Sequence, residues 1–124
     1  MLGRPAYINT GSDQHLPADR GVESFRDNTF RVLDAATAAG VDWIDTARSY
    51  GRAEEFVGQW WRQRAADDPS WIERAPTVSS KWGYTYVGGW DRDAQVHEVK
   101  DHSLAQFQAQ WALTQATLPR VQSA

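Results

Sequence analysis

Apolar residues recur along the chain in two alternating patterns, short runs and longer segments with helical spacing. The short runs predict three strands, at residues 6–9, 41–45 and 77–82. The longer segments predict three helices, at residues 24–39, 53–64 and 104–118. Strands that alternate with helices pair in parallel and are joined by right-handed crossovers. We therefore expect an α/β fold with a parallel sheet.

Local signals mark where the predicted helices begin and end. Gly40 follows the first helix, and glycine readily adopts the left-handed conformation that ends many helices. Glu54 and Glu55 lie in the first turn of the second helix, where the helix dipole favours negative charge. Ser103 and Gln106 have the spacing of a capping box at the start of the third helix.

Two helices have an apolar face that is expected to pack on the sheet. In the second helix this face consists of Phe56, Val57, Trp60 and Trp61. In the third helix it consists of Leu104, Phe107, Trp111, Thr114 and Leu118, with Pro119 ending the pattern. Residues 71–72 are expected to form a short extra turn.

The connections between the elements also carry information. Residues 10–21 are polar and contain glycine and proline, which predicts a loop. Residues 83–93 form a longer connection than usual, so we expect a functional loop there. Three parallel strands would leave an exposed edge and a bare inner face. We therefore expect either a larger β/α domain or self-association through the exposed sheet edge.

Composition narrows the class of protein. The chain has 124 residues, 41% of them hydrophobic, a formal charge of -3 and no cysteine. Mild acidity argues against a nucleic-acid partner, and no apolar run approaches the roughly 20 residues of a membrane span. The absence of cysteine suits a reducing compartment, so we expect a cytoplasmic protein. The seven tryptophans are expected to fill the interior, with a sugar-binding or partner-binding surface as the alternative.

Three polar residues lie at or just after the ends of predicted strands. Asp45 ends the second strand, Tyr50 lies in the following loop, and Lys81 lies near the end of the third strand. In parallel β/α folds the active site is built at these ends, and neighbouring strands lie about 4.8 Å apart. We therefore expect the three side chains to converge.

A carboxylate, a phenol and an ammonium in proximity suit proton transfer to a carbonyl. A tyrosine phenol has an unperturbed pKa of about 10, which is too high for easy proton transfer near neutrality. A nearby ammonium lowers the pKa of a phenol, and a carboxylate keeps that ammonium charged and oriented. Such a phenol can protonate the alkoxide that develops when a hydride reaches a carbonyl. The alternative is an ordinary ion pair of Asp45 and Lys81, with Tyr50 as a surface aromatic.

The segments that carry these residues resemble a known family. Residues 40–54, GVDWIDTARSYGRAE, resemble the aldo-keto reductase signature, in which Asp-Thr-Ala leads to Tyr-Gly and then to a helix-opening Glu. Residues 78–83, VSSKWG, resemble the lysine strand of that family. Residues 3–9 and 96–104 resemble bacterial members more weakly. The resemblance covers most of the chain.

This resemblance implies the N-terminal part, residues 1–124 with about three β/α units, of a TIM (β/α)₈ barrel that binds NADP(H) without a Rossmann domain. It implies Tyr50 as the general acid and Lys81 as the cation beside it. Asp45 is implied as the partner of Lys81 and as a cofactor-binding residue near the nicotinamide ribose. Trp82 and Trp90 are expected to bind the substrate, a small aldehyde or ketone.

One residue of the family's active site is not matched. The resemblance implies a fourth catalytic residue, a histidine at the end of the fourth strand, but no histidine follows the third helix. Residues 121–124 fall where that strand is expected, with Gln122 near the histidine position. We therefore expect a truncated barrel that is weakly active or inactive alone. The alternative is a non-catalytic remnant or interaction module derived from such a barrel.

The other charged residues near these motifs have two interpretations. Arg48 and Arg52 flank Tyr50 and are either plain surface charges or groups that steer an anionic cofactor or substrate. His97 and His102 lie five residues apart and are expected to be solvated rather than metal ligands, because a zinc site needs more ligands. We expect no metal site.

Overall fold

The structure is a computed structural model that describes residues 21–89 and 94–123. The predicted strand at residues 6–9 and nearly all of the loop after it lie outside the described residues. The described chain forms, in order, α1 (Val22–Ala38), β1 (Trp43–Asp45), α2 (Ala53–Asp67), the short 3₁₀ helix η2 (Pro69–Glu73), β2 (Thr77–Ser80), β3 (Tyr84–Tyr86), β4 (Glu98–Lys100), α3 (Leu104–Thr117) and β5 (Val121–Ser123).

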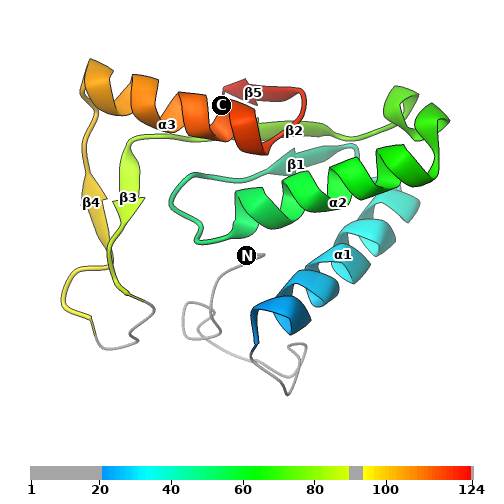
Figure 1. Cartoon of the computed structure of the whole chain (residues 1–124), viewed down its shortest axis with the longest axis horizontal. Coiled ribbons are helices and arrows are strands. Elements are labelled where there is room, and N and C mark those ends of the chain that lie inside the picture. The colour runs from blue at the N-terminus through cyan, green and yellow to red at the C-terminus, as the bar shows by residue number, and fades with distance from the viewer. Residues whose placement is uncertain (1–20, 90–93, 124) are drawn as a thin grey trace.

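Three of the strands form a parallel sheet in the order β1-β2-β5 (Figure 1). Ile44 lies opposite Val78, and Val78 lies opposite Val121, so β2 is the middle strand. The predicted α/β class with parallel strands is confirmed. The third strand of this sheet is β5, at residues 121–123, where the sequence places the strand that follows the third helix.

The helices cover the sheet with α2 in the middle, where it contacts both α1 and α3 (Figure 1). Beneath them lies one apolar core, to which α1, α2, β2 and the end of α3 contribute. Its buried residues are Leu33, Val57, Trp60, Trp61, Val78 and Leu118. The predicted apolar face of α2 is confirmed, because all four of its residues are buried. No helix in the described part of the chain is long and apolar enough to cross a membrane.

Tryptophan side chains supply much of this core. The rings of Trp60 and Trp61 each meet the ring of Trp71 edge to face, with centroids 5.2 and 5.3 Å apart. The buried indole nitrogen of Trp60 donates a hydrogen bond to Asp34 Oδ1 at 2.8 Å, so its polar atom is satisfied. The expected interior role is confirmed for these residues, whereas Trp43 on β1 is more than half exposed.

The predicted helix ends are confirmed. Gly40 has a φ of 91°, and the amides of Gly40 and Val41 donate to the carbonyls of Thr37 and Ala36 at 3.0 Å each. This is the paired bonding of a Schellman motif, which requires a left-handed residue after the helix. At the start of α3, the Ser103 hydroxyl accepts a hydrogen bond from the amide of Gln106 at 3.2 Å.

One prediction about α3 is wrong. Leu104, expected on the buried face, is exposed. It is the first residue of the helix, and the first turn of α3 extends past the parallel sheet towards β3 and β4 (Figure 1). The apolar face is therefore buried only from the middle of the helix, at Thr114 and at Leu118.

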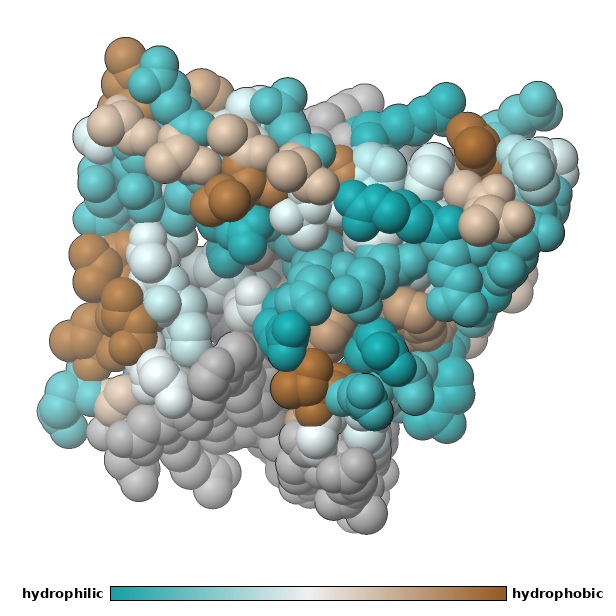
Figure 2. All heavy atoms as spheres, in the orientation of Figure 1, coloured by the Kyte–Doolittle hydropathy of each residue, from teal (hydrophilic) through white to brown (hydrophobic). Residues whose placement is uncertain are grey.

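The expectation that residues 83–93 form a loop is also wrong for their first part. Tyr84–Tyr86 is a strand that pairs antiparallel with Glu98–Lys100, with Tyr84 opposite Lys100 and Tyr86 opposite Glu98. The cause is the high β propensity of tyrosine and threonine together with the pairing partner that follows. Apolar side chains gather on the surface of this β3–β4 hairpin (Figure 2), where Val87, Val96 and Val99 are exposed.

Helices α2 and α3 meet along a line of non-apolar residues, which we call the α2–α3 seam: Glu54, Gly58 and Arg62. Thr114 Oγ1 donates to Glu54 Oε1 at 2.8 Å. The Arg62 guanidinium donates to the carbonyls of Ala116 and Thr117 at 3.1 and 2.7 Å, which satisfies the free end of α3. Between them, a Cβ on Gly58 would lie 2.2 Å from the Thr117 carbonyl oxygen, so only glycine permits this approach.

Candidate active site

The carboxyl ends of β1 and β2 bring Asp45 and Lys81 together. Asp45 pairs in register with Ser79, and Lys81 follows two residues later, just beyond the end of β2. The Lys81 ammonium donates to Asp45 Oδ2 and, at 2.8 Å, to the Thr46 carbonyl. The Ser79 hydroxyl donates to Asp45 Oδ1 at 2.8 Å. Both oxygens of the carboxylate are therefore engaged.

Tyr50 reaches the same point through two tight turns. Its amide donates to the Ala47 carbonyl at 3.0 Å, and its own carbonyl accepts from the amide of Ala53 at 3.1 Å. These turns bring the half-buried ring to Lys81, whose Nζ lies 5.2 Å from the ring centroid. That distance is within the range of a cation–π contact. The structure thus brings Asp45, Tyr50 and Lys81 together, with the ammonium between the other two groups.

The electrostatic setting keeps Asp45 ionised. Partial burial of the carboxyl acts to raise its pKa, but hydrogen bonds from Lys81 and Ser79 and the charge of Lys81 outweigh that effect. The pKa of Asp45 therefore lies below its usual range. At neutral pH the carboxylate is charged and holds the ammonium in a fixed direction.

A pocket of about 340 Å³ opens beside this group and is lined by Ala47, Ser49, Tyr50, Lys81, Trp82, Tyr84 and Glu98. Of the two tryptophans predicted to bind substrate, Trp82 lines the pocket, and its ring packs edge to face on Phe107 at 5.0 Å. Trp90 lies outside the described residues. The volume is near the lower end of the range of about 300–1,000 Å³ that small-molecule sites occupy.

Sequence analysis missed Tyr84 and Glu98, which reach the pocket from the β3–β4 hairpin. The alternation of tyrosine and threonine at residues 84–86, followed by two glycines, is a strand and turn signal that could have revealed the hairpin. Gln110 of α3 holds the base of the β3–β4 hairpin in place. The side-chain oxygen of Gln110 accepts from the Gly83 amide at 2.7 Å, and its nitrogen donates to the Tyr84 carbonyl at 2.9 Å.

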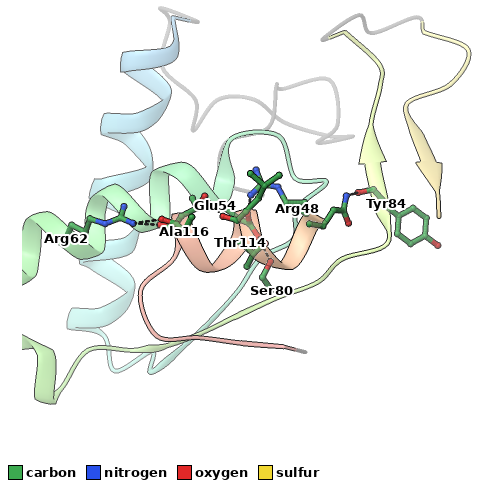
Figure 3. Close-up of polar contacts among 10 residues, drawn as sticks. Arg48, Glu54, Arg62, Ser80, Tyr84, Thr114 and Ala116 are labelled. Carbon is green, nitrogen blue, oxygen red and sulfur yellow. Dashed lines mark hydrogen bonds and ion pairs between the residues drawn. The ribbon is translucent and has the colours of Figure 1, made fainter. Parts of the chain in front are cut away.

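A second ion pair lies behind the pocket, at the start of α2. The buried Glu54 carboxylate accepts hydrogen bonds from Arg48, Ser80 and Thr114 (Figure 3). The guanidinium of Arg52 pairs with Glu55 at 2.8 Å. Both arginines that flank Tyr50 are thus bound to carboxylates of α2, which argues against a free role in steering an anionic ligand.

Within residues 21–89 and 94–123, no group of three or more histidines, cysteines or acidic residues is placed to hold a metal ion. His102 meets the rings of Trp82 and Tyr84 edge to face, with centroids 5.4 and 5.7 Å away. His97 stacks on Tyr86 at 6.5 Å. His102 is exposed, as we expected, although it contacts these two rings, whereas His97 is half-buried against Tyr86.

Comparisons with known proteins agree with this architecture. The sequence profile of the aldo/keto reductase family matches residues 18–110. Aldo-keto reductase str7 of Strobilurus tenacellus is 50% identical over 40 residues, which are 32% of this chain and 12% of that protein. A crystal structure from Pseudomonas aeruginosa, assigned to the aldo-keto reductases, is similar with a TM-score of 0.57 and 25% identity, over 79% of this chain and 35% of that one.

The matched parts of the chain thus span about a third of the length of the solved relative and about an eighth of the curated one. The family match covers three quarters of the chain and includes α1, β1, the Tyr50 turn, α2, β2 and both strands of the hairpin. This chain therefore belongs to the aldo/keto reductase family of oxidoreductases.

Proposed function

We propose that this chain forms part of an enzyme that reduces a small aldehyde or ketone with NADPH. The observation that carries the proposal is the position of Lys81, which donates to Asp45 and lies over the ring of Tyr50 at the edge of a pocket. A phenol beside a fixed ammonium is suited to protonating an oxygen that is gaining negative charge.

Each residue has a separate part in the proposed reaction. The dinucleotide, when bound, supplies the hydride that reaches the carbonyl carbon. Tyr50 gives its phenol proton to the carbonyl oxygen, so the product is an alcohol. Lys81 stabilises the negative charge left on the phenol, and Asp45 directs the Lys81 ammonium through a charge-assisted hydrogen bond. These roles rest on the geometry of the three side chains and on family membership.

The residues present fit one end of such a cofactor. A pocket of about 340 Å³ suits a nicotinamide ring or a small carbonyl compound rather than a whole dinucleotide. Asp45 is half exposed beside Lys81 and offers carboxylate oxygens that can accept hydrogen bonds from ribose hydroxyls. We therefore place Asp45 near the nicotinamide ribose. The preference for NADP(H) over NAD(H) stays a prediction, as does a cytoplasmic location.

The pocket lining indicates a compact substrate. Trp82 and Tyr84 provide aromatic walls, while Ala47 and Ser49 leave room at the side next to Tyr50. We propose Trp82 and Trp90 as substrate-binding residues and add Tyr84 from the hairpin. This arrangement favours a small aldehyde or ketone with an apolar or aromatic substituent.

We further propose that the parallel sheet is part of a (β/α)₈ barrel, which the other strands of a longer protein would complete. The barrel accounts for the exposed surface of Trp43 on β1. The 124-residue chain alone is then expected to be weakly active or inactive.

A non-catalytic role is the second candidate. Among the described strands, β1 and β5 are the two outer members of the sheet, so each is paired on one side only. Such edges can pair with another chain. A concentration-dependent mass in light scattering would support self-association through an edge, whereas a monomer at all concentrations would contradict it.

The test of the enzymatic proposal is NADPH oxidation with a panel of aldehydes and ketones, by the chain and by any longer natural form that contains it. We expect Tyr50→Phe to lower kcat by roughly 10²–10⁴-fold, because the general acid is removed. Tyr86→Phe is the control, since it removes a phenol of β3 that does not line the pocket, and it should retain turnover. Turnover by Tyr50→Phe within a few-fold of the unaltered protein would refute the assigned role.

A further inference from the structure

Glu54 is the most buried charged group at this end of the sheet, yet it does not line the pocket. Its side chain is 2% exposed, and burying a carboxylate is costly unless it is paired and hydrogen-bonded. The cost is offset by three donors. Ser80 Oγ lies 2.5 Å and Thr114 Oγ1 2.8 Å from Oε1, and the Arg48 guanidinium donates to Oε2.

Each donor belongs to an element that shapes the pocket. Arg48 lies two residues before Tyr50 in the connecting loop. Ser80 is the residue directly before Lys81 at the end of β2. Thr114 lies on α3 one turn after Gln110, which fixes the base of the β3–β4 hairpin at Gly83 and Tyr84. One carboxylate is thus bonded to the loop, the strand and the helix that support the pocket (Figure 3).

The loop is held at Arg48 by both its backbone and its side chain. The Arg48 amide donates to the Lys81 carbonyl at 3.0 Å, and two residues earlier the Thr46 amide donates to the Ser79 carbonyl at 2.9 Å. The Arg48 side chain is directed to Glu54. The backbone bonds set the distance between the loop and β2, and the ion pair fixes the loop against the start of α2.

From this geometry we propose that Glu54 is a positioning residue for the active site. It fixes the loop that carries Tyr50 relative to Lys81 and to α3, without touching a ligand itself. The catalytic consequence rests on the proposed function, whereas the positional role stands on the contacts alone. A purely structural role would predict uniform loosening of the whole fold on its loss. The positioning role predicts loosening concentrated in residues 46–50.

The experiment compares Glu54→Gln with Glu55→Gln in the full chain. Glu55 is the matched control, because it lies in the same helical turn and pairs with an arginine but is 39% exposed. Amide hydrogen exchange is followed by NMR at Thr46 and Arg48, with Val57 in the core as the reference. We expect Glu54→Gln to speed exchange at the two loop amides by about 10-fold or more beyond any change at the reference. Glu55→Gln should leave all three unchanged.

Equal acceleration at loop and core, or no acceleration at all, would overturn the proposal. If Glu54→Gln does not fold, Arg48→Gln carries the test, since it removes the charged link from the loop side and leaves Glu54 bonded to Ser80 and Thr114. Faster exchange at the loop amides and unchanged exchange at the Gly83 amide, which Gln110 holds, would support the proposal. Unchanged loop amides would overturn it.

Kinetics separate this inference from the proposed function. With a protein that oxidises NADPH, Glu54→Gln should lower kcat by about 10-fold or more while KM stays within about 2-fold, because small displacements of reacting groups are costly. A loosened loop, with no turnover by any longer natural form that contains this chain, would contradict the proposed function and leave the positional role standing. A loosened loop with unchanged kcat would refute the catalytic consequence of Glu54.

Discussion

Two ion pairs have carboxylates nine residues apart, Asp45 before and Glu54 after one loop, and they differ mainly in exposure. In the first pair the side chains of Lys81 and Asp45 are 38% and 50% exposed. In the second pair those of Arg48 and Glu54 are 25% and 2% exposed. In the exposed pair, Lys81 lines the pocket, and Asp45 keeps half of its side-chain surface open to solvent. In the buried pair the Glu54 carboxylate accepts hydrogen bonds from three protein side chains, so it supports structure around the site.

The difference follows from where each carboxylate lies. Asp45 ends β1 at the rim of the sheet, where half of its side-chain surface is exposed. Glu54 lies in the first turn of α2, enclosed by the end of β2 and the middle of α3. The two ion pairs should therefore contribute different amounts to the free energy of unfolding, because solvent screens an exposed pair more strongly than a buried one.

The largest expected effect on stability is that of Glu54→Ala. Removing one partner of a buried pair leaves Arg48, Ser80 and Thr114 without their acceptor, so the free energy of unfolding should fall by about 3–5 kcal/mol. Glu55→Ala removes an exposed partner and should cost no more than about 1 kcal/mol. Urea denaturation followed by tryptophan fluorescence measures both. Similar losses for the two variants would break the contrast between buried and exposed pairs.

A smaller loss is expected for Thr114→Val. This change removes one hydrogen bond to a charged carboxylate, which contributes about 1.5–3 kcal/mol. Thr117→Val on the same helix is the control, because its hydroxyl donates only to the Leu113 carbonyl four residues earlier. The same urea experiment measures the difference between the variants. Equal stability of the two would mean that α3 contributes little to enclosing Glu54.

A still smaller effect on stability is expected for Asp45→Asn at neutral pH. The pair with Lys81 is half exposed, so the free energy of unfolding should change by about 0–1 kcal/mol. Under the proposed function, NADPH oxidation should nevertheless fall sharply, because Lys81 loses the carboxylate that directs it. Measuring stability and turnover on the same preparation tests both. A loss of stability as large as that of Glu54→Ala would show that exposure does not separate the two pairs.

The smallest effect is a pH dependence. The pKa of Asp45 is lowered in the fold from its model-peptide value of 3.8. A lowered pKa means that the carboxylate contributes stability above the unfolded pKa, and that this contribution disappears as pH falls through the folded pKa. The urea midpoint of the unaltered chain should therefore fall slightly more steeply below pH 3.8 than that of Asp45→Asn. If the urea midpoints of the two proteins fall equally steeply at acid pH, this prediction is wrong.

Sequence patterns predicted the elements that periodicity controls. The apolar face of α2 and the glycine after α1 both follow from local rules, and the structure has them where expected. The convergence of Asp45, Tyr50 and Lys81 also follows from simple geometry, because all three lie at carboxyl ends of parallel strands or just after them.

What periodicity did not predict depends on contacts between distant elements. Glu54 and Glu55 look alike in sequence, since both are acidic residues in the first turn of a helix. They differ because adjacent helical residues point about 100° apart, so one faces the helix–sheet interface and the other faces solvent. The β3–β4 hairpin was missed for a related reason, since its partner strands are separated by residues 87–97.

The α2–α3 seam has a consequence for how related sequences can vary in length. Its three members are spaced at intervals of four, which places the carboxylate, the close backbone approach and the arginine on one face of α2. An insertion or deletion of one residue between positions 54 and 62 would turn half of that face by about 100°. Insertions and deletions among related sequences should therefore avoid residues 54–62 and accumulate between β3 and β4.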